Sequence, residues 1–307
     1  MTVSIYTHVR CLDHDPGADH PESPARLAAV LDALADPRYA GVERIEAPRA
    51  LREQLARVHR SEMIDVILTQ EPQSGFHRLD ADTVMSPGSA EAALRAAGAV
   101  CAAVDAAIDG RRRRAFCAVR PPGHHATPSV PMGFCLFNSV AVGAAHALVQ
   151  HGLARVAIVD FDVHHGNGTQ DIFWNDARVM YASSHQSPLY PGTGARGETG
   201  AGNIVNAPLS AGSGSAEFRQ AYETIVLPAL EAFAPQLVMI SAGFDAHRLD
   251  PLASLQLTGD DYAWVTARLV ELADRHALGR IVSSLEGGYS LEGLREATLA
   301  HVDALSR

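Results

Sequence analysis

The sequence predicts an α/β protein built on a parallel β-sheet with helices on both faces. Short, nearly continuous apolar segments alternate along the chain with longer, alanine-rich amphipathic segments. Strands of a parallel sheet are buried on both faces, and they have this uninterrupted apolar character. No proline- or serine-rich linker divides the 307 residues, so we expect one domain over residues 1–307.

The two kinds of segment give the elements in chain order. The short apolar runs predict strands at residues 116–120, 155–161, 179–183, 237–241 and 280–285. The amphipathic runs predict helices at residues 89–109, 139–151, 216–232, 260–276 and 291–304. Between them we expect long loops, which usually carry function or are disordered, at residues 121–137, 186–215 and 245–259.

The composition argues against several classes of protein. A formal charge of −10 argues against nucleic-acid binding, which needs a basic surface, and we interpret the run Arg111–Arg114 as a solvated turn. The chain has no lysine, which Schiff-base enzymes and phosphate-binding P-loops require. We find no apolar run that could span a membrane and no secretion signal at the start. The four scattered cysteines indicate neither disulfides nor a thiolate zinc site, so we expect a cytoplasmic protein.

Polar residues and glycines follow four of the expected strands. They form the segments Pro121–His125, Asp160–Gly168, Ala242–Asp245 and Glu286–Tyr289. In open α/β sheets, ligands bind beyond the carboxyl ends of the strands. We therefore expect the functional site at this end of the sheet.

The segment 160–164 predicts a metal site. Side chains alternate along an extended chain, so Asp160, Asp162 and His164 would share one face. Oxygen and nitrogen ligands without thiolate suit zinc, iron, manganese or cobalt, and Asp245 can add a third ligand from a neighbouring strand end. The alternative is a capping cluster before a helix at 169–174. Burying paired carboxylates would then be costly without a cation.

His124, His125 and Tyr289 are candidate catalytic residues. Adjacent imidazoles after a Pro-Pro-Gly turn could stand beside a water activated by the metal, one to move a proton and the other to donate a hydrogen bond. Tyr289, after two glycines, could place its hydroxyl against a developing oxyanion. The alternatives are a pair of surface histidines and a packed tyrosine.

Together these motifs resemble the histone deacetylase superfamily, with its arginase–deacetylase fold. The resemblance spans nearly the whole chain and also includes residues 20–27, 58–59, 120 and 133–135. The phrase His-His-Gly-Asn-Gly-Thr-Gln at 164–170 looks like the class II branch and its bacterial relatives. In the class I branch, aspartate usually stands where this chain has Asn167.

The resemblance implies two metal ions. Asp162, His164 and Asp245 would bind the catalytic zinc, for which iron or cobalt could substitute. A structural potassium ion would be held, partly through backbone carbonyls, by Asp160, Asp162, His164, Ser183 and Ser184.

The resemblance also implies catalytic roles. His125 would act as general base and then acid, with His124 as its electrostatic partner and Tyr289 polarising the amide carbonyl. Asp160 would support His124, and Asn167 would stand behind His125. Because Asn167 is neutral, His125 should be less basic than in the class I arrangement.

A narrow channel would admit an aliphatic acyl-amine side chain. Phe134 and Tyr190 would form its walls, with tyrosine at 190 where close relatives commonly have phenylalanine. Gly133, Leu252 and Asp82 are also assigned to the channel. The expected reaction is hydrolysis of an N-acetyl or acyl amide, chiefly acetyl-lysine in proteins or peptides, to the free amine and acetate.

Three alternatives remain open. An acetylpolyamine amidohydrolase would use the same chemistry on an acetylated small amine, but polyamine-selective relatives carry glutamate after the Asp-Pro pair, where this chain has Leu252. A ureohydrolase would need a second manganese and a further aspartate after the histidine. A non-catalytic acetyl-ligand binder would not need His124, His125 and Tyr289 intact. The oligomeric state is not fixed by these residues.

Overall fold

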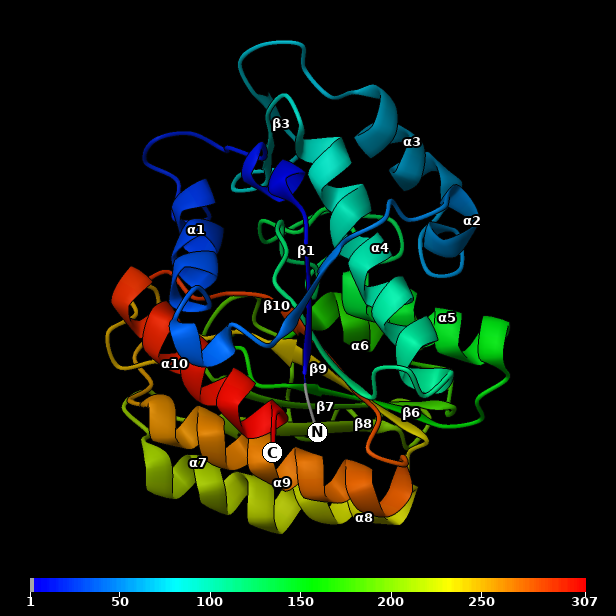
Figure 1. The fold of residues 1–307 in the computed structure, drawn as a ribbon, viewed down its shortest axis with the longest axis vertical. Helices are drawn as coiled ribbons and strands as arrows, with labels where there is room; N and C mark the ends of the chain where they lie inside the picture. The colour runs from blue at the N-terminus through cyan, green and yellow to red at the C-terminus, as the bar shows by residue number, and fades with distance from the viewer. Residues whose placement is uncertain (1–2) are drawn as a thin grey trace.

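The computed structural model describes residues 3–307, and its centre is an eight-stranded sheet in which all neighbouring strands are parallel (Figure 1). The strand order is β2-β1-β5-β10-β9-β6-β7-β8. The strands are β1 Ser4–Thr7, β2 Glu43–Glu46, β5 Arg114–Cys117, β6 Val156–Asp160, β7 Val179–Gln186, β8 Ile204–Leu209, β9 Leu237–Ala242 and β10 Ile281–Leu285. A separate antiparallel pair consists of β3 His77–Arg78 and β4 Val84–Met85.

Helices lie on both sides of the sheet, with α4 and α5 on one side and α9 and α10 on the other (Figure 1). The helices are α1 Pro24–Ala33, α2 Arg52–Leu55, α3 Ser61–Thr69, α4 Ser89–Ile108, α5 Ser139–His151, α6 Asn167–Phe173, α7 Ser215–Ala221, α8 Leu227–Phe233, α9 Gly259–His276 and α10 Leu291–Leu305. Short 3₁₀ turns occupy Val9–Leu12 and Pro37–Tyr39. Among the described helices, none combines the length and apolar character of a membrane span.

The central strands have the burial that a sheet covered on both faces requires. Every residue of β6, β7, β9 and β10 is buried. Their short apolar runs therefore identified them from the sequence to within three residues at either end. The predicted parallel sheet with helices on both faces is confirmed.

The expected loop 186–215 is wrong in part, because it contains the edge strand β8. At an edge only one side of a strand is paired, so Pro208 is tolerated there and the apolar run is interrupted. The other edge strand, β2, is almost wholly exposed and has the sequence Glu-Arg-Ile-Glu. The composition of β2 is therefore not that of a buried strand, and Asn206 and Pro208 interrupt the apolar run of β8. The elements β1, α1 and α3 were also not expected.

The expected helix 216–232 is divided into α7 and α8 by a wider π-helical turn at Tyr222–Val226. Pro228 stands in the first turn of α8. Proline has no N–H to donate to the preceding turn, so the regular α-helical pattern cannot run through it.

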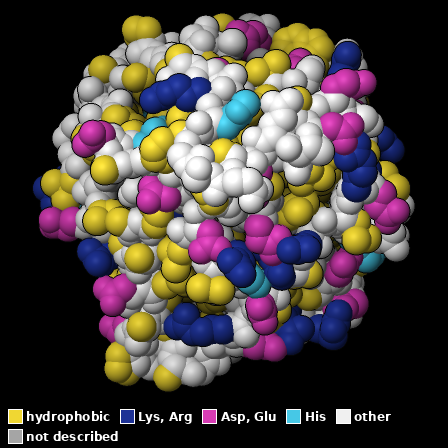
Figure 2. Space-filling model, turned by 90° about the horizontal axis from the view of Figure 1, so that it is seen from above, with side chains coloured by type: hydrophobic (Ala, Val, Ile, Leu, Met, Phe, Trp, Pro, Cys, Tyr) yellow, Lys and Arg dark blue, Asp and Glu magenta, His cyan; other side chains and the backbone are white. Residues whose placement is uncertain are grey.

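The arginine run is not wholly solvated, contrary to the expectation. Arg114 lies in β5, is fully buried, and its Nη2 is 2.8 Å from Oδ1 of Asp274. Arg111–Arg113 remain in the turn before the strand. On the face shown in Figure 2, arginines lie beside acidic side chains and form no single basic patch.

The strand register brings the carboxyl ends of the central strands to one level. Asp160 of β6 pairs with Ser241 of β9, and Ser241 pairs with Ser284 of β10. Ser284 in turn pairs with Cys117 of β5. The four polar segments that follow these strands therefore leave the sheet side by side.

Candidate active site

Three potential metal ligands meet beyond β6 and β9. The Nδ1 atom of His164 lies 3.1 Å from Oδ1 of Asp162 and 3.1 Å from Oδ2 of Asp245. All three side chains are buried, and their ligating atoms lie within 4.8 Å of one another. The structure thus brings together the three residues that were predicted to bind the catalytic metal.

Glycines make room for the two carboxylates. A Cβ atom at Gly243 would lie 2.0 Å from Oδ2 of Asp162, and one at Gly287 would lie 2.1 Å from Oδ2 of Asp245. The Gly287 amide donates a hydrogen bond to Oδ2 of Asp162 over 2.9 Å. The Val163 amide donates to Oδ1 of Asp245 over 2.8 Å. The backbone therefore fixes both carboxylates while side chains are excluded from the space around them.

The electrostatics of the triad fit a divalent cation. Burial, together with the charge of Asp162, raises the pKa of Asp245 to about 7. Burial also acts to raise the pKa of Asp162, but His124 and His164 outweigh it and hold the value below its usual range. Two buried carboxylates repel each other until a cation is placed between them. An oxygen and nitrogen donor set without thiolate suits zinc, iron, cobalt or manganese.

Asp160 does not join the triad, contrary to the simple alternation of an extended chain. The strand β6 ends at Asp160, and its Oδ2 lies 2.9 Å from Nδ1 of His124 and accepts a hydrogen bond from the Tyr181 hydroxyl over 2.9 Å. Burial acts to lower the pKa of His124, but Asp162 and Asp160 raise it to about 10. The two carboxylates therefore favour the cationic form of His124.

The capping alternative for the 160–164 segment is wrong. Helix α6 begins at Asn167, its N-cap residue is Gly166, and no side chain caps it. Asp162 and His164 instead face Asp245 from the next strand.

His125 is oriented by Asn167. The Asn167 amide nitrogen points at Sδ of Met132 over 3.4 Å, which leaves Oδ1 to accept from Nδ1 of His125 over 2.8 Å. The Nε2 atom of neutral His125 then carries the lone pair. Burial, and then the neighbouring His124 and His164, lower the pKa of His125 well below its usual value. His125 is thus a neutral imidazole with a free acceptor atom.

Tyr289 is held from two sides. Its backbone amide donates to Oδ2 of Asp250 over 2.7 Å, and the Arg26 guanidinium stands 4.8 Å from the centre of its ring. Arg26 also donates to the carbonyl oxygens of Glu286 and Gly288, over 2.5 and 2.6 Å. Burial raises the pKa of Tyr289 well above its usual value, although Arg26 opposes this. The phenol therefore stays protonated and can donate a hydrogen bond.

Glu286 is a site residue to which sequence reasoning gave no role. Its Oε2 accepts hydrogen bonds from the amides of Gly123 and His124, over 2.6 and 3.1 Å, whereas its buried Oε1 has no hydrogen-bond partner among residues 3–307. Burial raises the pKa of Glu286 to about 7, with His124 acting in the opposite direction. Glu286 fixes the backbone of the histidine pair. Its position between a buried strand and two glycines is the sequence feature that could have identified it as a site residue.

A cavity of about 240 Å³ leads to the triad. Its lining contains all the residues that were assigned to the channel, and also His125, His164 and Tyr289. Leu189 lines it too and was not predicted. The lining residues are Asp82, His125, Gly133, Phe134, His164, Leu189, Tyr190, Leu252 and Tyr289.

The two serines assigned to potassium are adjacent to Asp160 but direct their hydroxyls elsewhere. Ser183 pairs with Asp160 across the sheet, and its Oγ lies 2.9 Å from Nδ1 of His185. The Ser184 hydroxyl donates to the Tyr222 hydroxyl over 3.4 Å. A cation here would therefore depend on backbone carbonyls, and the potassium site stays a prediction.

Known proteins resemble this chain over nearly its whole length. Residues 20–305 match the family described as the histone deacetylase domain. The chain is 40% identical over 300 residues to a protein named probable deacetylase from Archaeoglobus fulgidus, covering 95% of this chain and 83% of the relative. It is 41% identical over 294 residues to a histone deacetylase-like amidohydrolase from Pseudomonas aeruginosa, covering 94% and 77%.

A solved structure agrees. The chain superposes on the HD domain of HDA15 with a TM-score of 0.94 and 37% identity, covering 99% of this chain and 88% of the other. This match supports the arginase–deacetylase fold that the sequence motifs implied, and the relatives' names support a hydrolase that acts on amides. The chain belongs to the histone deacetylase family.

Proposed function

We propose that the protein is a zinc-dependent deacetylase that hydrolyses the acetyl amide of acetylated lysine in proteins or peptides. The observation that carries this proposal is the buried triad Asp162, His164 and Asp245, with its ligating atoms within 4.8 Å, at a cavity that His125 and Tyr289 also line. Iron or cobalt could take the place of zinc at the same donors. When bound there, the cation supplies Lewis-acid activation of a water molecule and of the amide carbonyl.

His125 is suited to move the proton. Because Asn167 accepts from Nδ1 of His125, the Nε2 atom is free to take a proton from the attacking water and return it to the leaving amine. Asn167 is uncharged, so it orients the ring without making the imidazole strongly basic. The pair therefore suits a base that must later act as an acid.

Tyr289 and His124 are suited to stabilise charge. The protonated Tyr289 hydroxyl can donate to the carbonyl oxygen as negative charge develops there, and such a donor acts mainly in the transition state. Asp160, which is not among the proposed zinc ligands, lies 2.9 Å from Nδ1 of His124 and favours its cationic form, so His124 is suited to supply positive charge beside His125. The imidazole rings of His124 and His125 have centroids 4.0 Å apart.

The shape of the channel supports an extended aliphatic substrate. Phe134 and Tyr190 line the cavity, and the Tyr190 ring meets the His125 ring edge to face with centroids 5.1 Å apart. Apolar walls favour the methylene stem of an acetyl-lysine side chain. Leu252, 37% exposed, also lines the cavity and adds no charge to it.

A second substrate class is favoured by one observation. Asp82 also lines the cavity, and a carboxylate there would attract the free ammonium groups of an acetylated polyamine. We infer that acetyl-lysine is preferred, because Asp82 is the one acid in a lining that otherwise consists of apolar, aromatic and imidazole groups and Gly133.

We also infer a structural potassium ion beside Asp160 and a reducing compartment such as the cytoplasm. Asp160, Asp162 and His164 would supply the potassium ligands together with the backbone of Ser183 and Ser184. The four cysteines, which are all free and buried, support a reducing compartment.

Two measurements test the proposed function. Asp162→Ala should lose both zinc and acetate release, since it removes a metal ligand. For the substrate, kcat/KM should be compared on an acetyl-lysine peptide and on acetylspermidine, using the wild type and Leu252→Glu. We expect the wild type to favour the peptide and the variant to shift towards the polyamine. A wild type that strongly prefers acetylspermidine would contradict the substrate assignment, and turnover in zinc-free Asp162→Ala would contradict the mechanism.

A further inference from the structure

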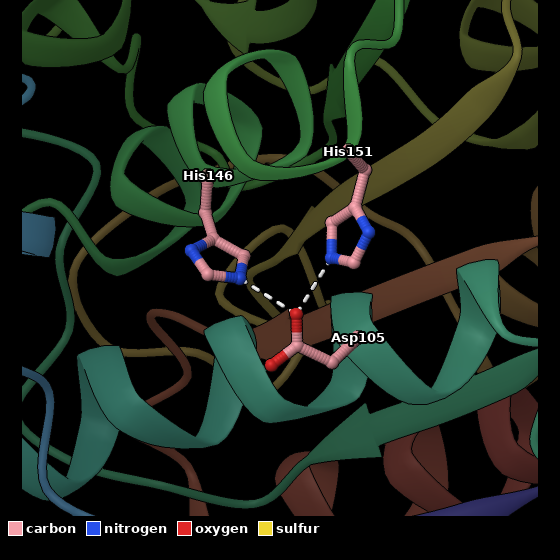
Figure 3. Close-up of side chains that lie close together, drawn as sticks. All are labelled: Asp105, His146 and His151. Atoms are coloured by element: carbon pink, nitrogen blue, oxygen red, sulfur yellow. Dashed lines mark hydrogen bonds and ion pairs between the residues drawn. The ribbon is translucent and has the colours of Figure 1, made fainter.

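A second group of metal-ligating side chains lies between α4 and α5 (Figure 3). His146 and His151 come from α5 and Asp105 from α4, and both imidazoles point at the same carboxylate oxygen. The Nε2 atoms of His146 and His151 each lie 2.7 Å from Oδ1 of Asp105. All three ligand atoms lie within 4.8 Å of one another.

Close packing of the two helices creates this juxtaposition. A Cβ atom at Gly143 of α5 would lie 2.4 Å from a side-chain carbon of Val100 on α4. The absence of a side chain at Gly143 therefore lets the helix backbones approach. Asp105, five residues after Val100, meets His146 and His151, which are three and eight residues after Gly143. The last of them, His151, is the final residue of α5, so its side chain has more freedom than one in mid-helix.

The cluster is open to solvent on one side. The Asp105 side chain is 44% exposed and that of His151 is 22% exposed, whereas His146 is 5% exposed. A cation could therefore enter at the carboxylate and complete its coordination with water. Two imidazole nitrogens and one carboxylate oxygen form a donor set that late first-row divalent metals prefer.

We propose that Asp105, His146 and His151 form a second divalent-metal site, which takes late first-row cations such as zinc and is separate from the triad Asp162, His164 and Asp245. Its effect would be to join α4 to α5, because the ligands come from both helices. Any cation that binds only the folded protein stabilises it by mass action.

Arg57 opposes metal binding in the present arrangement. Its Nη1 lies 2.6 Å from Nδ1 of His146, and since arginine can only donate, Nδ1 must carry the lone pair. The proton of neutral His146 then lies on Nε2, where it is donated to Asp105. For Nε2 to bind a metal, this proton must move to Nδ1 and the Arg57 guanidinium must leave. Arg57 therefore tunes the affinity of the site.

The test is a titration of the enzyme already loaded with one zinc per chain. Zn²⁺ alone is added and followed by calorimetry, with Ni²⁺ as a second probe. We expect a second equivalent to bind. Losing a residue that merely supports a metal ligand typically costs about 10–100-fold in affinity, so His151→Asn and Asp105→Asn, which lose a ligand itself, should weaken this binding by more than about 100-fold.

Matched variants distinguish this site from a surface that binds metal weakly. His276 also contacts a carboxylate, with Nε2 2.6 Å from Oε2 of Glu231, but no second imidazole joins that contact. His276→Asn should therefore keep the second equivalent. Arg57→Gln should bind it several-fold more tightly, because an amide oxygen can accept from the protonated Nδ1.

Three results would overturn the proposal. The first is that the wild type binds no second equivalent of zinc. The second is that both His151→Asn and Asp105→Asn still bind it. The third is that His276→Asn loses the second equivalent as fully as His151→Asn does. Thermal unfolding without added metal checks that each variant is folded. In the wild type the melting temperature should rise with the second equivalent of zinc. That rise should be absent in His151→Asn.

Discussion

Replacing Asn167 by aspartate tests how the structure sets the basicity of His125. The side chain keeps its shape, and a carboxylate oxygen takes the place of Oδ1, 2.8 Å from Nδ1 of His125. In the wild type, burial and then His124 and His164 keep the pKa of His125 well below its usual value of 6.5. His125 must be neutral to accept a proton, so activity falls as the pH drops below that pKa. The acid limb of the wild-type profile should therefore lie below pH 6.5.

The size of the effect follows from Coulomb attraction. Opposite charges about 4 Å apart attract by about 4 kcal/mol at an effective dielectric constant of about 20. Part of this is lost to the cost of burying the new carboxylate. A neighbouring opposite charge typically moves a pKa by about 1–3 pH units. The new charge favours imidazolium, so the acid limb of kcat/KM should move to higher pH by about this amount.

The assay is the pH profile of kcat/KM on an acetyl-lysine peptide, with zinc content measured in parallel. Asn175→Asp is the matched control, since Asn175 is exposed and the substitution adds the same charge away from the imidazoles. We expect the control to follow the wild type. An unchanged acid limb in a zinc-loaded Asn167→Asp enzyme would refute the assignment of His125 as the base.

Three further predictions follow from contacts at the site. Gly243→Ala should prevent metal retention, because its Cβ would lie 2.0 Å from Oδ2 of Asp162. The control Gly41→Ala, whose Cβ would meet no atom within 4 Å, should retain zinc; metal analysis measures both. Tyr289→Phe should keep zinc and KM but lose about 10²–10³-fold in kcat, the usual effect of deleting one oxyanion donor; a near-normal kcat under chemistry-limited conditions would return Tyr289 to a packing role. Tyr181→Phe removes a buried donor to a carboxylate and should lower the free energy of unfolding by about 1–3 kcal/mol in chemical denaturation; an unchanged midpoint would contradict that hydrogen bond.

The sequence predicts the centre of the fold better than its margins. Strands such as β6 and β9 are buried on both faces, so their apolar runs identify them directly. The edge strands β2 and β8 are paired on one side only; β2 is charged and exposed, and Asn206 and Pro208 interrupt the apolar run of β8. A short exposed strand is specified by its neighbour in the sheet, which a single sequence does not reveal.

The candidate site, like the fold, could be predicted from the sequence only in part. Asp162, His164 and Asp245 could be assembled from the sequence because each directly follows a recognisable strand, and parallel strands end at one edge. Tyr181 could not be assigned to the site from the sequence, because its hydrogen bond to Asp160 depends on the register of β6 against β7. Hydrophobic runs locate strands but do not fix their register.

The network behind Tyr289 was also not predicted. Arg26 and Arg120 are buried and both form ion pairs with the buried Glu22. The Nη1 atom of Arg26 lies 2.9 Å from Oε1 of Glu22. Arginine and glutamate are usually exposed, so composition assigns them to the surface. Only the tertiary structure shows that this ion network supports the turn carrying Tyr289.

The most direct test of the central claim is acetate release under control of the metal. Wild-type protein is assayed on an acetyl-lysine peptide as loaded with zinc, after removal of zinc with a chelator, and after zinc is restored, beside Asp245→Ala treated in the same way. We predict equal amounts of acetate and free lysine from the loaded wild type, no release after stripping, recovery on reloading, and none from Asp245→Ala. Acetate release at the wild-type rate from the stripped protein, or from Asp245→Ala, would contradict metal-dependent hydrolysis at this triad.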